Sequence, residues 1–314
     1  MSEDAAGVRP PAVAAARTSD RELADALARA LPAPVRVLAR RTSPYASSFP
    51  LAELDVEAGD GTRLTVVWKD LTPGALLPGA RAARGAAVGA PARELRAYEL
   101  LTAAGLGTPR LIAAVQEPER AWLFLEAVRG ARLEHVGDRG AWAATARWLA
   151  GAHAQLTACA ADPAWPPAWA PAALDLRDPR FAPLAPAFAA ARARLADAPP
   201  SAIHGELFPA NVLIGDDGRV CVLDWETIAR GPALLDLAAL TAGAWEDPDE
   251  PLAEAYRAAL PDPPPREAFL ADLAAARLLT AAQWLAAPAD WRPPPEHARD
   301  WLRDAEAIAG RIPA

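Results

Sequence analysis

The sequence predicts an α+β protein in two lobes, a small β-rich one with one helix and a larger, mainly helical one with a short β-hairpin. Three observations lead to this prediction. The first 128 residues contain apolar runs typical of strands, the remainder is rich in Ala and Leu at helical spacing, and one turn-linked strand pair interrupts that helical part. A chain of 314 residues is long enough to bury a core in each lobe.

The first lobe is predicted to span residues 18–128, after a flexible tail at 1–17 that is rich in Ala and Pro. Residues 18–31 start with Thr, Ser and Asp and have helical apolar spacing, so we expect a helix there. Strands are expected at 35–41, 51–57 and 63–69, with a hairpin turn at 58–62, and a further strand pair at 110–128. A glycine-rich connection at 74–91 leads to one inserted helix, which ends near Gly105.

The second lobe is predicted to span residues 129–314. It opens with an amphipathic helix over 142–156, followed by a loop of Pro and Trp at 162–172. A compact hairpin then joins the strands NVLI and RVCVLDW through the turn GDDG. From Gly231 onward, Ala- and Leu-rich helices punctuated by prolines are expected.

Composition excludes several classes of protein. The net charge of −8 argues against nucleic acid or an anionic membrane as the main partner. We find neither a secretory signal nor an apolar run of about 20 residues. Cys159 and Cys221 are read as two buried structural thiols of a cytoplasmic protein, and the four scattered histidines do not predict a zinc site.

Two residues stand out because each is the only one of its type. Lys69, at the end of an apolar strand, is the single lysine among 32 basic residues, and Asn211 is the single asparagine. The abundance of Ala, Arg, Pro and Gly indicates a GC-rich coding bias, which removes Lys and Asn wherever another residue serves. By itself, each has a simple structural interpretation, Lys69 as a solvated strand-end charge and Asn211 as a turn residue. Their uniqueness makes both candidates for function.

The hairpin of the second lobe gathers further polar residues. His204, Glu206 and Asn211 lie in the loop before its first strand, and Asp224 ends its second strand. The amide of Asn211 and the carboxylate of Asp224 are hard oxygen ligands suited to Mg²⁺ that also binds phosphate. A neighbouring loop carboxylate could accept a hydroxyl proton during phosphoryl transfer.

The segment HGELFPAN, followed by LDWE, resembles the aminoglycoside phosphotransferase and choline kinase-like family, whose fold is protein-kinase-like. In that family the loop reads HGDxxxxN, and an Asp that closes the hairpin holds the metal. The resemblance extends from about Ser43 to about Leu240. It implies that Asn211 and Asp224 are Mg²⁺ ligands and that His204 braces the loop.

The same resemblance implies a nucleotide site. Lys69 matches the lysine that holds the α- and β-phosphates of ATP, and Glu94 matches its ion-pair partner. The segment FLEAVRG resembles the hinge between lobes, where the backbone of Glu126 and Val128 faces the adenine. A compact ammonium group serves phosphate differently from a broad guanidinium, which is why arginine would not replace Lys69.

Two departures from the family pattern concern the chemistry. Glu206 stands where the family has its catalytic Asp, and the extra methylene moves the carboxylate by about one bond length, a scale that matters for catalysis. Where kinases often have a glycine-rich phosphate loop, this chain has SPYASSF, in which Ser47 and Ser48 could offer hydroxyls and amides to phosphate. The P-loop motif GxxxxGK[ST] is missing from the sequence.

These features predict a kinase that binds MgATP and transfers the γ-phosphate to a hydroxyl of a small molecule, such as an aminocyclitol, a sugar or another metabolite. Glu206 would orient or deprotonate the acceptor. One alternative keeps this chemistry but takes Ser or Thr of a peptide as acceptor, as in natural-product maturation. Another is a pseudokinase, a nucleotide-binding partner protein in which Glu206 marks lost catalysis.

Overall fold

The computed structural model describes residues 18–46, 48–78, 80, 91–168, 174–242, 249–286 and 299–310. The chain divides into two compact units, the first of Met1–Pro91 with Arg110–Ala127 and the second of Ala92–Pro109 with Val128–Ala314. The helix that the sequence places between strands of the first lobe therefore counts with the second unit. The predicted tail at 1–17, Ser47 and most of the connection at 74–91 lie outside the described residues.

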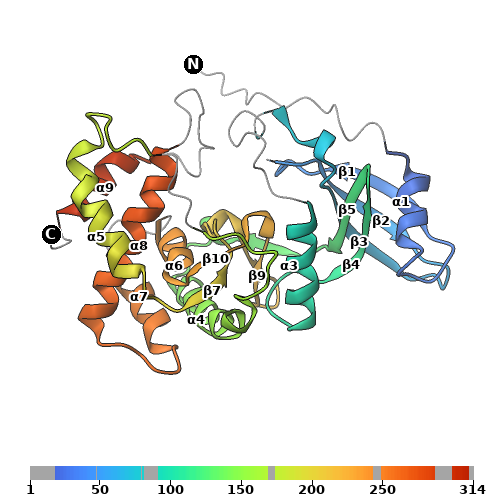
Figure 1. Ribbon diagram of the computed structural model, residues 1–314. Coiled ribbons are helices and arrows are strands. Elements are labelled where there is room, and N and C mark those ends of the chain that lie inside the picture. The colour runs from blue at the N-terminus through green and yellow to red at the C-terminus, as the bar shows by residue number, and fades with distance from the viewer. Residues whose placement is uncertain are drawn as a thin grey trace, which may run out of the picture. The chain divides into compact units, whose positions relative to one another are not determined.

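The first unit is built on a five-stranded antiparallel sheet (Figure 1). Its order is β1-β2-β3-β5-β4, with β1 at Arg36–Thr42, β2 at Leu51–Glu57, β3 at Arg63–Asp70, β4 at Leu111–Glu117 and β5 at Arg120–Glu126. In β2, Leu54 and Val56 are buried, while Glu53 and Asp55 on the opposite face pair with Arg41 of β1. This alternation fixes which face of the sheet covers the core.

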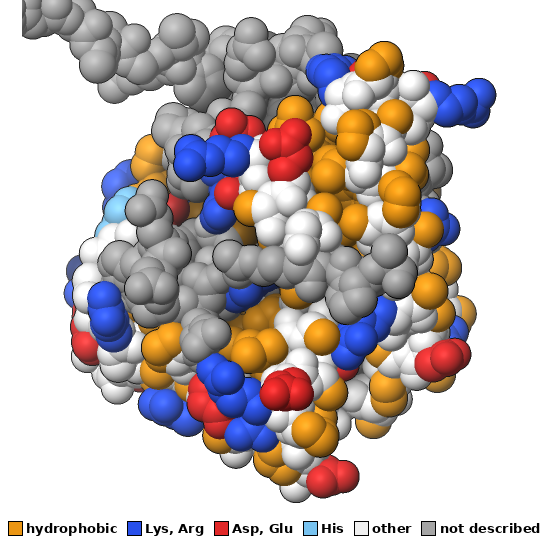
Figure 2. Space-filling model, turned by 90° about the vertical axis from the view of Figure 1, so that its left-hand side faces the viewer, with side chains coloured by type: hydrophobic (Ala, Val, Ile, Leu, Met, Phe, Trp, Pro, Cys, Tyr) orange, Lys and Arg blue, Asp and Glu red, His pale blue; other side chains and the backbone are white. Residues whose placement is uncertain are grey.

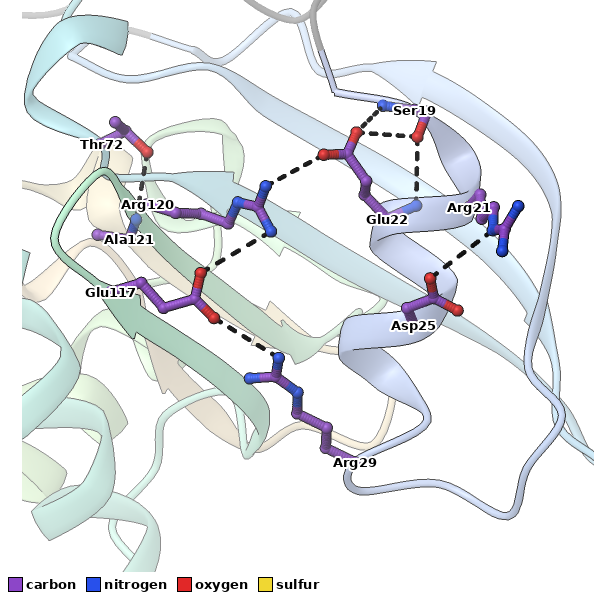
Figure 3. A network of polar contacts seen from close by, with 9 residues as sticks. All are labelled: Ser19, Arg21, Glu22, Asp25, Arg29, Thr72, Glu117, Arg120 and Ala121. Atoms are coloured by element: carbon purple, nitrogen blue, oxygen red, sulfur yellow. Dashed lines mark hydrogen bonds and ion pairs between the residues drawn. The ribbon is translucent and has the colours of Figure 1, made fainter.

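Helix α1 (Asp20–Leu27) packs its apolar side, which includes Leu23 and Leu27, into the core of this sheet. Ser19 caps the helix through a capping box with Glu22. Figure 3 shows how α1 is also tied to the sheet by charges. The Arg120 guanidinium lies 3.1 Å from Glu22 and 3.9 Å from Glu117, and Arg29 lies 3.5 Å from Glu117.

The second unit is mainly helical (Figure 1). Its helices are α3 (Pro91–Ala103), α4 (Arg139–Leu156), α5 (Ala185–Leu195), α6 (Leu234–Ala242), α7 (Asp249–Ala258), α8 (Arg266–Leu285) and α9 (Trp301–Ala309). Two small sheets accompany them, one of β6 (Gly130–Arg132), β8 (Val212–Gly215) and β9 (Val220–Val222), the other of β7 (Pro200–Ile203) and β10 (Ala229–Pro232). Helix α8 packs against α5, α6 and α9, and α4 packs against α7.

Short 3₁₀ helices connect several of these elements: η1 at Pro73–Ala75, η3 at Leu133–His135, η4 at Thr157–Cys159, η5 at Ala182–Leu184, η6 at Pro209–Asn211 and η7 at Trp225–Thr227. The helix expected over 18–31 ends at Leu27, because the ring of Pro32 cannot follow a helical turn without clashing with the carbonyl four residues before it. Cys221 is buried as predicted, but Cys159 is only half-buried, since it lies in η4 at the end of α4.

In the view of Figure 2, basic and acidic side chains lie among hydrophobic ones, without a large patch of one sign among the described residues. Within the same described part of the chain, a helix of the length and hydrophobicity needed to cross a membrane is not found.

Candidate active site

The loop that begins at His204 leaves the end of β7, whose last residue, Ile203, pairs with Ala229 of β10. The His204 side chain is fully buried and is held at both ring nitrogens. Its Nε2 lies 2.7 Å from the carbonyl oxygen of Leu223, and its Nδ1 accepts the backbone N–H of Glu206 at 3.2 Å. This bonding pattern requires a neutral ring that carries its proton on Nε2. The geometry therefore supports a bracing role for His204 rather than proton transfer.

Asp236, in the first turn of α6, fixes the backbone of the same loop. Its carboxylate accepts the N–H groups of His204 at 2.7 Å and Gly205 at 2.9 Å, and its Oδ2 lies 3.2 Å from Nε2 of His153. The other ring nitrogen of His153 lies 2.9 Å from the Tyr256 hydroxyl. Burial, and then the Asp236 carboxylate, raise the pKa of Tyr256, so its hydroxyl keeps the proton that it donates to His153.

This buried chain links α4, α6 and α7 to the loop. Asp236 stands in GPALLDLAAL, a segment that also resembles the family, whereas His153 and Tyr256 were not singled out from the sequence. A histidine on the apolar face of an amphipathic helix was the available signal, since a polar group that is buried there needs a partner.

Gly205 makes the loop's sharp turn possible. Its φ of 87° lies in a region that side chains disfavour, and a Cβ at this position would lie 2.6 Å from the carbonyl oxygen of Thr227. The Thr227 hydroxyl in turn donates to the carbonyl of His204 at 2.9 Å. The loop and the segment after Asp224 are therefore packed directly against each other.

Asn211 and Asp224 are brought to the same end of the β8–β9 hairpin. Val212 pairs with Val222, and the next backbone bond runs from the Leu223 N–H to the Asn211 carbonyl at 2.8 Å. The Nδ2 group of Asn211 donates to the Glu206 carbonyl at 3.0 Å, which orients the amide and makes Oδ1 the atom that Asn211 could offer to a metal. Asp224 has a left-handed backbone with φ 62°, and its N–H donates to the Tyr98 hydroxyl at 3.1 Å.

Glu94 and Glu226 extend this group of oxygen ligands. One carboxylate oxygen from each of Glu94, Asp224 and Glu226 lies within 4.8 Å of the others. Glu94 and Glu226 are buried, and Asp224 is half-buried. Hard oxygen ligands of this kind suit Mg²⁺, so the donor set fits the predicted metal. Glu226 was not assigned from the sequence, although it follows Asp224 by two residues in LDWE.

The remaining predicted residues belong to the first unit, apart from Val128. Lys69 is buried near the end of β3, paired with Leu51 and Leu123 of the neighbouring strands, and its Nζ lies 6.0 Å from the centre of the Phe49 ring. The ion pair between Lys69 and Glu94 stays a prediction.

Ser48 is buried, and its carbonyl accepts the N–H of Leu77 at 2.9 Å. Glu126 and Val128 are half-buried, and the N–H of Glu126 donates to the Arg110 carbonyl at 2.9 Å. In the hinge expected there, Glu126 would thus have only its carbonyl to offer to an adenine. Ser47 lies outside the described residues.

The sequence around this site matches a known protein family. The sequence model of the phosphotransferase enzyme family matches residues 80–270, well over half of the chain, including the loop from His204 to Asn211 and the metal-ligand candidate Asp224. The chain belongs to this family. The family predicted from the motifs HGELFPAN and LDWE is thereby confirmed. No curated protein matches the sequence of this phosphotransferase family member.

Solved structures of the same kind confirm the protein-kinase-like fold. Choline kinase LicA from Streptococcus pneumoniae matches with a TM-score of 0.62 at 17% identity, over 92% of this chain and 98% of LicA. Macrolide 2′-phosphotransferase MphH from Brachybacterium faecium matches with 0.53 at 21%, over 93% and 97% of the two chains. Spectinomycin phosphotransferase APH(9)-Ia, solved with ADP and spectinomycin, matches with 0.57 at 12%, over 93% and 99%. At these identities the likeness concerns the fold.

Proposed function

We propose that this protein transfers the γ-phosphate of ATP to a hydroxyl group of a small molecule. The observation that carries the proposal is the loop from His204 to Asn211, held on Asp236 and placed against Asp224 in a member of the phosphotransferase enzyme family. Similar folds in choline kinase LicA and in the macrolide and spectinomycin phosphotransferases support a small-molecule acceptor. The identity of that acceptor is to be found by testing a panel of hydroxyl compounds.

Asn211 and Asp224 would hold Mg²⁺, with Glu94 and Glu226 completing the negative environment of the ion. When bound, the metal neutralises charge on the phosphate groups. Lys69 would contact the α- and β-phosphates, and Ser48 would lie at the phosphate loop. The backbone of Glu126 and Val128 would face the adenine.

Glu206 would act on the acceptor. Its backbone is fixed on both sides, by the N–H bond to His204 and by the carbonyl bond from Asn211, so its half-buried side chain starts from a defined position. In the reaction, the acceptor O–H bond breaks and its proton moves to the Glu206 carboxylate. The acceptor oxygen forms a bond to the γ-phosphorus, the bond from that phosphorus to the β-phosphate oxygen breaks, and ADP leaves.

The test is ADP release by the purified protein with MgATP across a panel of aminoglycosides, macrolides, amino alcohols, sugars and Ser/Thr peptides. Acceptor-dependent ADP release with one small-molecule class is the expected result. Release only with peptides would instead establish a peptide kinase. If nucleotide binds but none of the acceptors stimulates turnover, the result favours a pseudokinase.

Substitutions of Glu206 separate a working loop from a decayed one. If the loop is built around Glu, Glu206→Asp retracts the carboxylate and slows turnover, by on the order of 100-fold. Glu206→Gln keeps the shape but removes the proton acceptor, and turnover falls further, while MgADP affinity is preserved. A rise in turnover for Glu206→Asp would show that the carboxylate is misplaced in the natural sequence, and the proposed role of Glu206 would be wrong.

A further inference from the structure

A cavity of about 450 Å³ lies in the second unit beside the strand pair β7–β10. Small-molecule sites commonly have volumes of about 300–1,000 Å³. The wall is formed by residues from the end of α5, the connection to β7, both strands and α8: Pro167, Arg192, Leu195, Ala196, Ala198, Pro200, Arg230, Gly231, Pro232 and Leu279. The cavity is thus large enough for a ligand, and it shares no residue with the candidate active site.

The register of the strand pair places this cavity away from the loop. Pro200, the first residue of β7, pairs with Pro232, and both line the cavity. The loop at His204 follows the opposite end of β7, about 10 Å along the strand at 3.3 Å per residue. A molecule bound here would contact the strands that carry the loop without occupying the position of the metal ligands.

The charged side chains described in the cavity wall are all positive. Of the ten lining residues that the structure describes, two are arginines, the others are apolar or glycine, and none is acidic, in a protein of net charge −8. Within the described part of the chain, neither Arg192 nor Arg230 forms an ion pair or a side-chain hydrogen bond. Asp197 lies in the same connection but is not among the lining residues.

Both arginines project from backbone that is held in place. Arg192 lies in the last turn of α5, on the same face as Leu195 and Ala196, three and four residues further on. In Arg230, the N–H donates to the Pro166 carbonyl at 2.8 Å, and the carbonyl accepts the Ala168 N–H at 2.7 Å. The two guanidinium groups therefore start from fixed points on the wall.

We propose that this cavity binds an organic anion, a carboxylate or a phosphate ester attached to an apolar body. Guanidinium groups recognise both oxyanions through paired N–H donors. The side chains of Leu195 and Leu279, with the prolines, offer apolar surface to the rest of the ligand. This site is independent of the proposed phosphoryl transfer, because its residues take no part in that chemistry.

Titration calorimetry on the full chain tests the proposal with three probes that share one apolar body: 1-naphthyl phosphate, 1-naphthoate and uncharged 1-naphthol. Saturating MgADP is present throughout, so that the phosphate probe does not bind at a nucleotide site. We expect the two anions to bind and naphthol to bind much more weakly. The phosphate and carboxylate arms show which oxyanion the cavity prefers.

The double variant Arg192→Gln, Arg230→Gln should weaken binding of the preferred anion by about tenfold or more, a factor that corresponds to 1.4 kcal/mol. The double variant Arg21→Gln, Arg177→Gln is the matched control, because it removes the same two charges from side chains that are 91% and 97% exposed and are not among the lining residues. Equal weakening in the control and in the variant of Arg192 and Arg230 would overturn the proposal. So would anion affinities equal to that of naphthol, or no binding to the natural protein at millimolar probe.

Discussion

Asp236 satisfies two consecutive backbone amides, those of His204 and Gly205, and contacts His153 with the same carboxylate. A carboxylate can do this because both of its oxygens accept hydrogen bonds, whereas the amide of an asparagine has only one acceptor oxygen. Asp236→Asn therefore leaves at least one buried donor facing an N–H group. We expect a loss of about 1–3 kcal/mol in the free energy of unfolding, measured by urea denaturation.

The same variant should lose more turnover than Tyr256→Phe, which removes only the hydroxyl group that is hydrogen-bonded to the His153 ring. Tyr256→Phe serves as the control, since it disturbs the same network without touching the loop backbone. If both variants lose equal turnover, Asp236 acts through general stability and not through the position of the loop.

Lys69 allows a test at the level of one functional group. Lys69→Arg keeps the charge at the end of β3 but replaces a compact ammonium by a broader, planar guanidinium. We expect an unfolding midpoint close to that of the natural protein, together with weaker MgATP affinity and lower kcat/KM. The measurement is ATP titration by calorimetry, followed by turnover with the acceptor found. Unchanged affinity and turnover would place the lysine outside the nucleotide site.

At the scale of elements, the end of β3 carries a second buried charge beside Lys69. Burial raises the pKa of the Asp70 carboxyl, and the hydrogen bond that it accepts from the Thr72 N–H only partly offsets this. A raised pKa in the folded state means that the carboxyl stabilises the fold most at low pH, below its unfolded value, and that this contribution is lost as the pH rises through the folded pKa.

Asp70→Asn removes this titration while keeping an oxygen for the Thr72 N–H. We therefore expect the stability of the variant, relative to the natural protein, to improve as the pH is raised from about 4 to 7. Asp60→Asn should change in the opposite direction, because bonds from Thr62 lower the pKa of Asp60 in the hairpin turn. Because the change for Asp60 lies mainly below its ordinary pKa of 3.8, denaturation midpoints are compared from about pH 3 to 7, and parallel curves for both variants would contradict the assignment.

At the scale of the whole molecule, the elements with a strong local pattern were predicted well. The strand at 51–57 has the predicted bounds, because alternating Leu and Val against Glu and Asp admit one register only. The strand pair β7–β10 was not predicted, since its residues pair across more than 25 positions of sequence and each strand is only four residues long. Helix α5 was missed for a related reason, because its Ala-rich sequence has little difference between its faces.

In the candidate site as well, the residues of the local motif were predicted, whereas side chains supplied by distant helices were not. The motif placed Glu206, Asn211 and Asp224 around one hairpin, and the bonds from Asn211 to Glu206 and from Leu223 to Asn211 agree with that placement. The side chains of His153 and Tyr256 that support the loop come from α4 and α7, far away in the sequence. A local pattern can mark His153 as a buried polar residue, but the partners of both side chains depend on tertiary packing.

Binding of nucleotide to the whole molecule gives the broadest prediction. The proposed contacts include Lys69 at the end of β3 and Asn211 and Asp224 at the β8–β9 hairpin. A ligand that binds only the folded protein stabilises it by about 2.7 kcal/mol at 100 times its Kd. We expect MgATP to raise the melting temperature by several degrees and ATP with a chelator to raise it less.

Asp224→Asn provides the matched comparison, because it removes one charged metal ligand and keeps the size of the side chain. In this variant, the additional shift that Mg²⁺ brings should shrink or vanish, while the shift with ATP alone persists. Thermal unfolding followed in both conditions measures the difference. A melting temperature that does not respond to millimolar MgATP in the natural protein would rule out the nucleotide site. A full Mg²⁺-dependent shift in Asp224→Asn would instead show that other residues hold the metal.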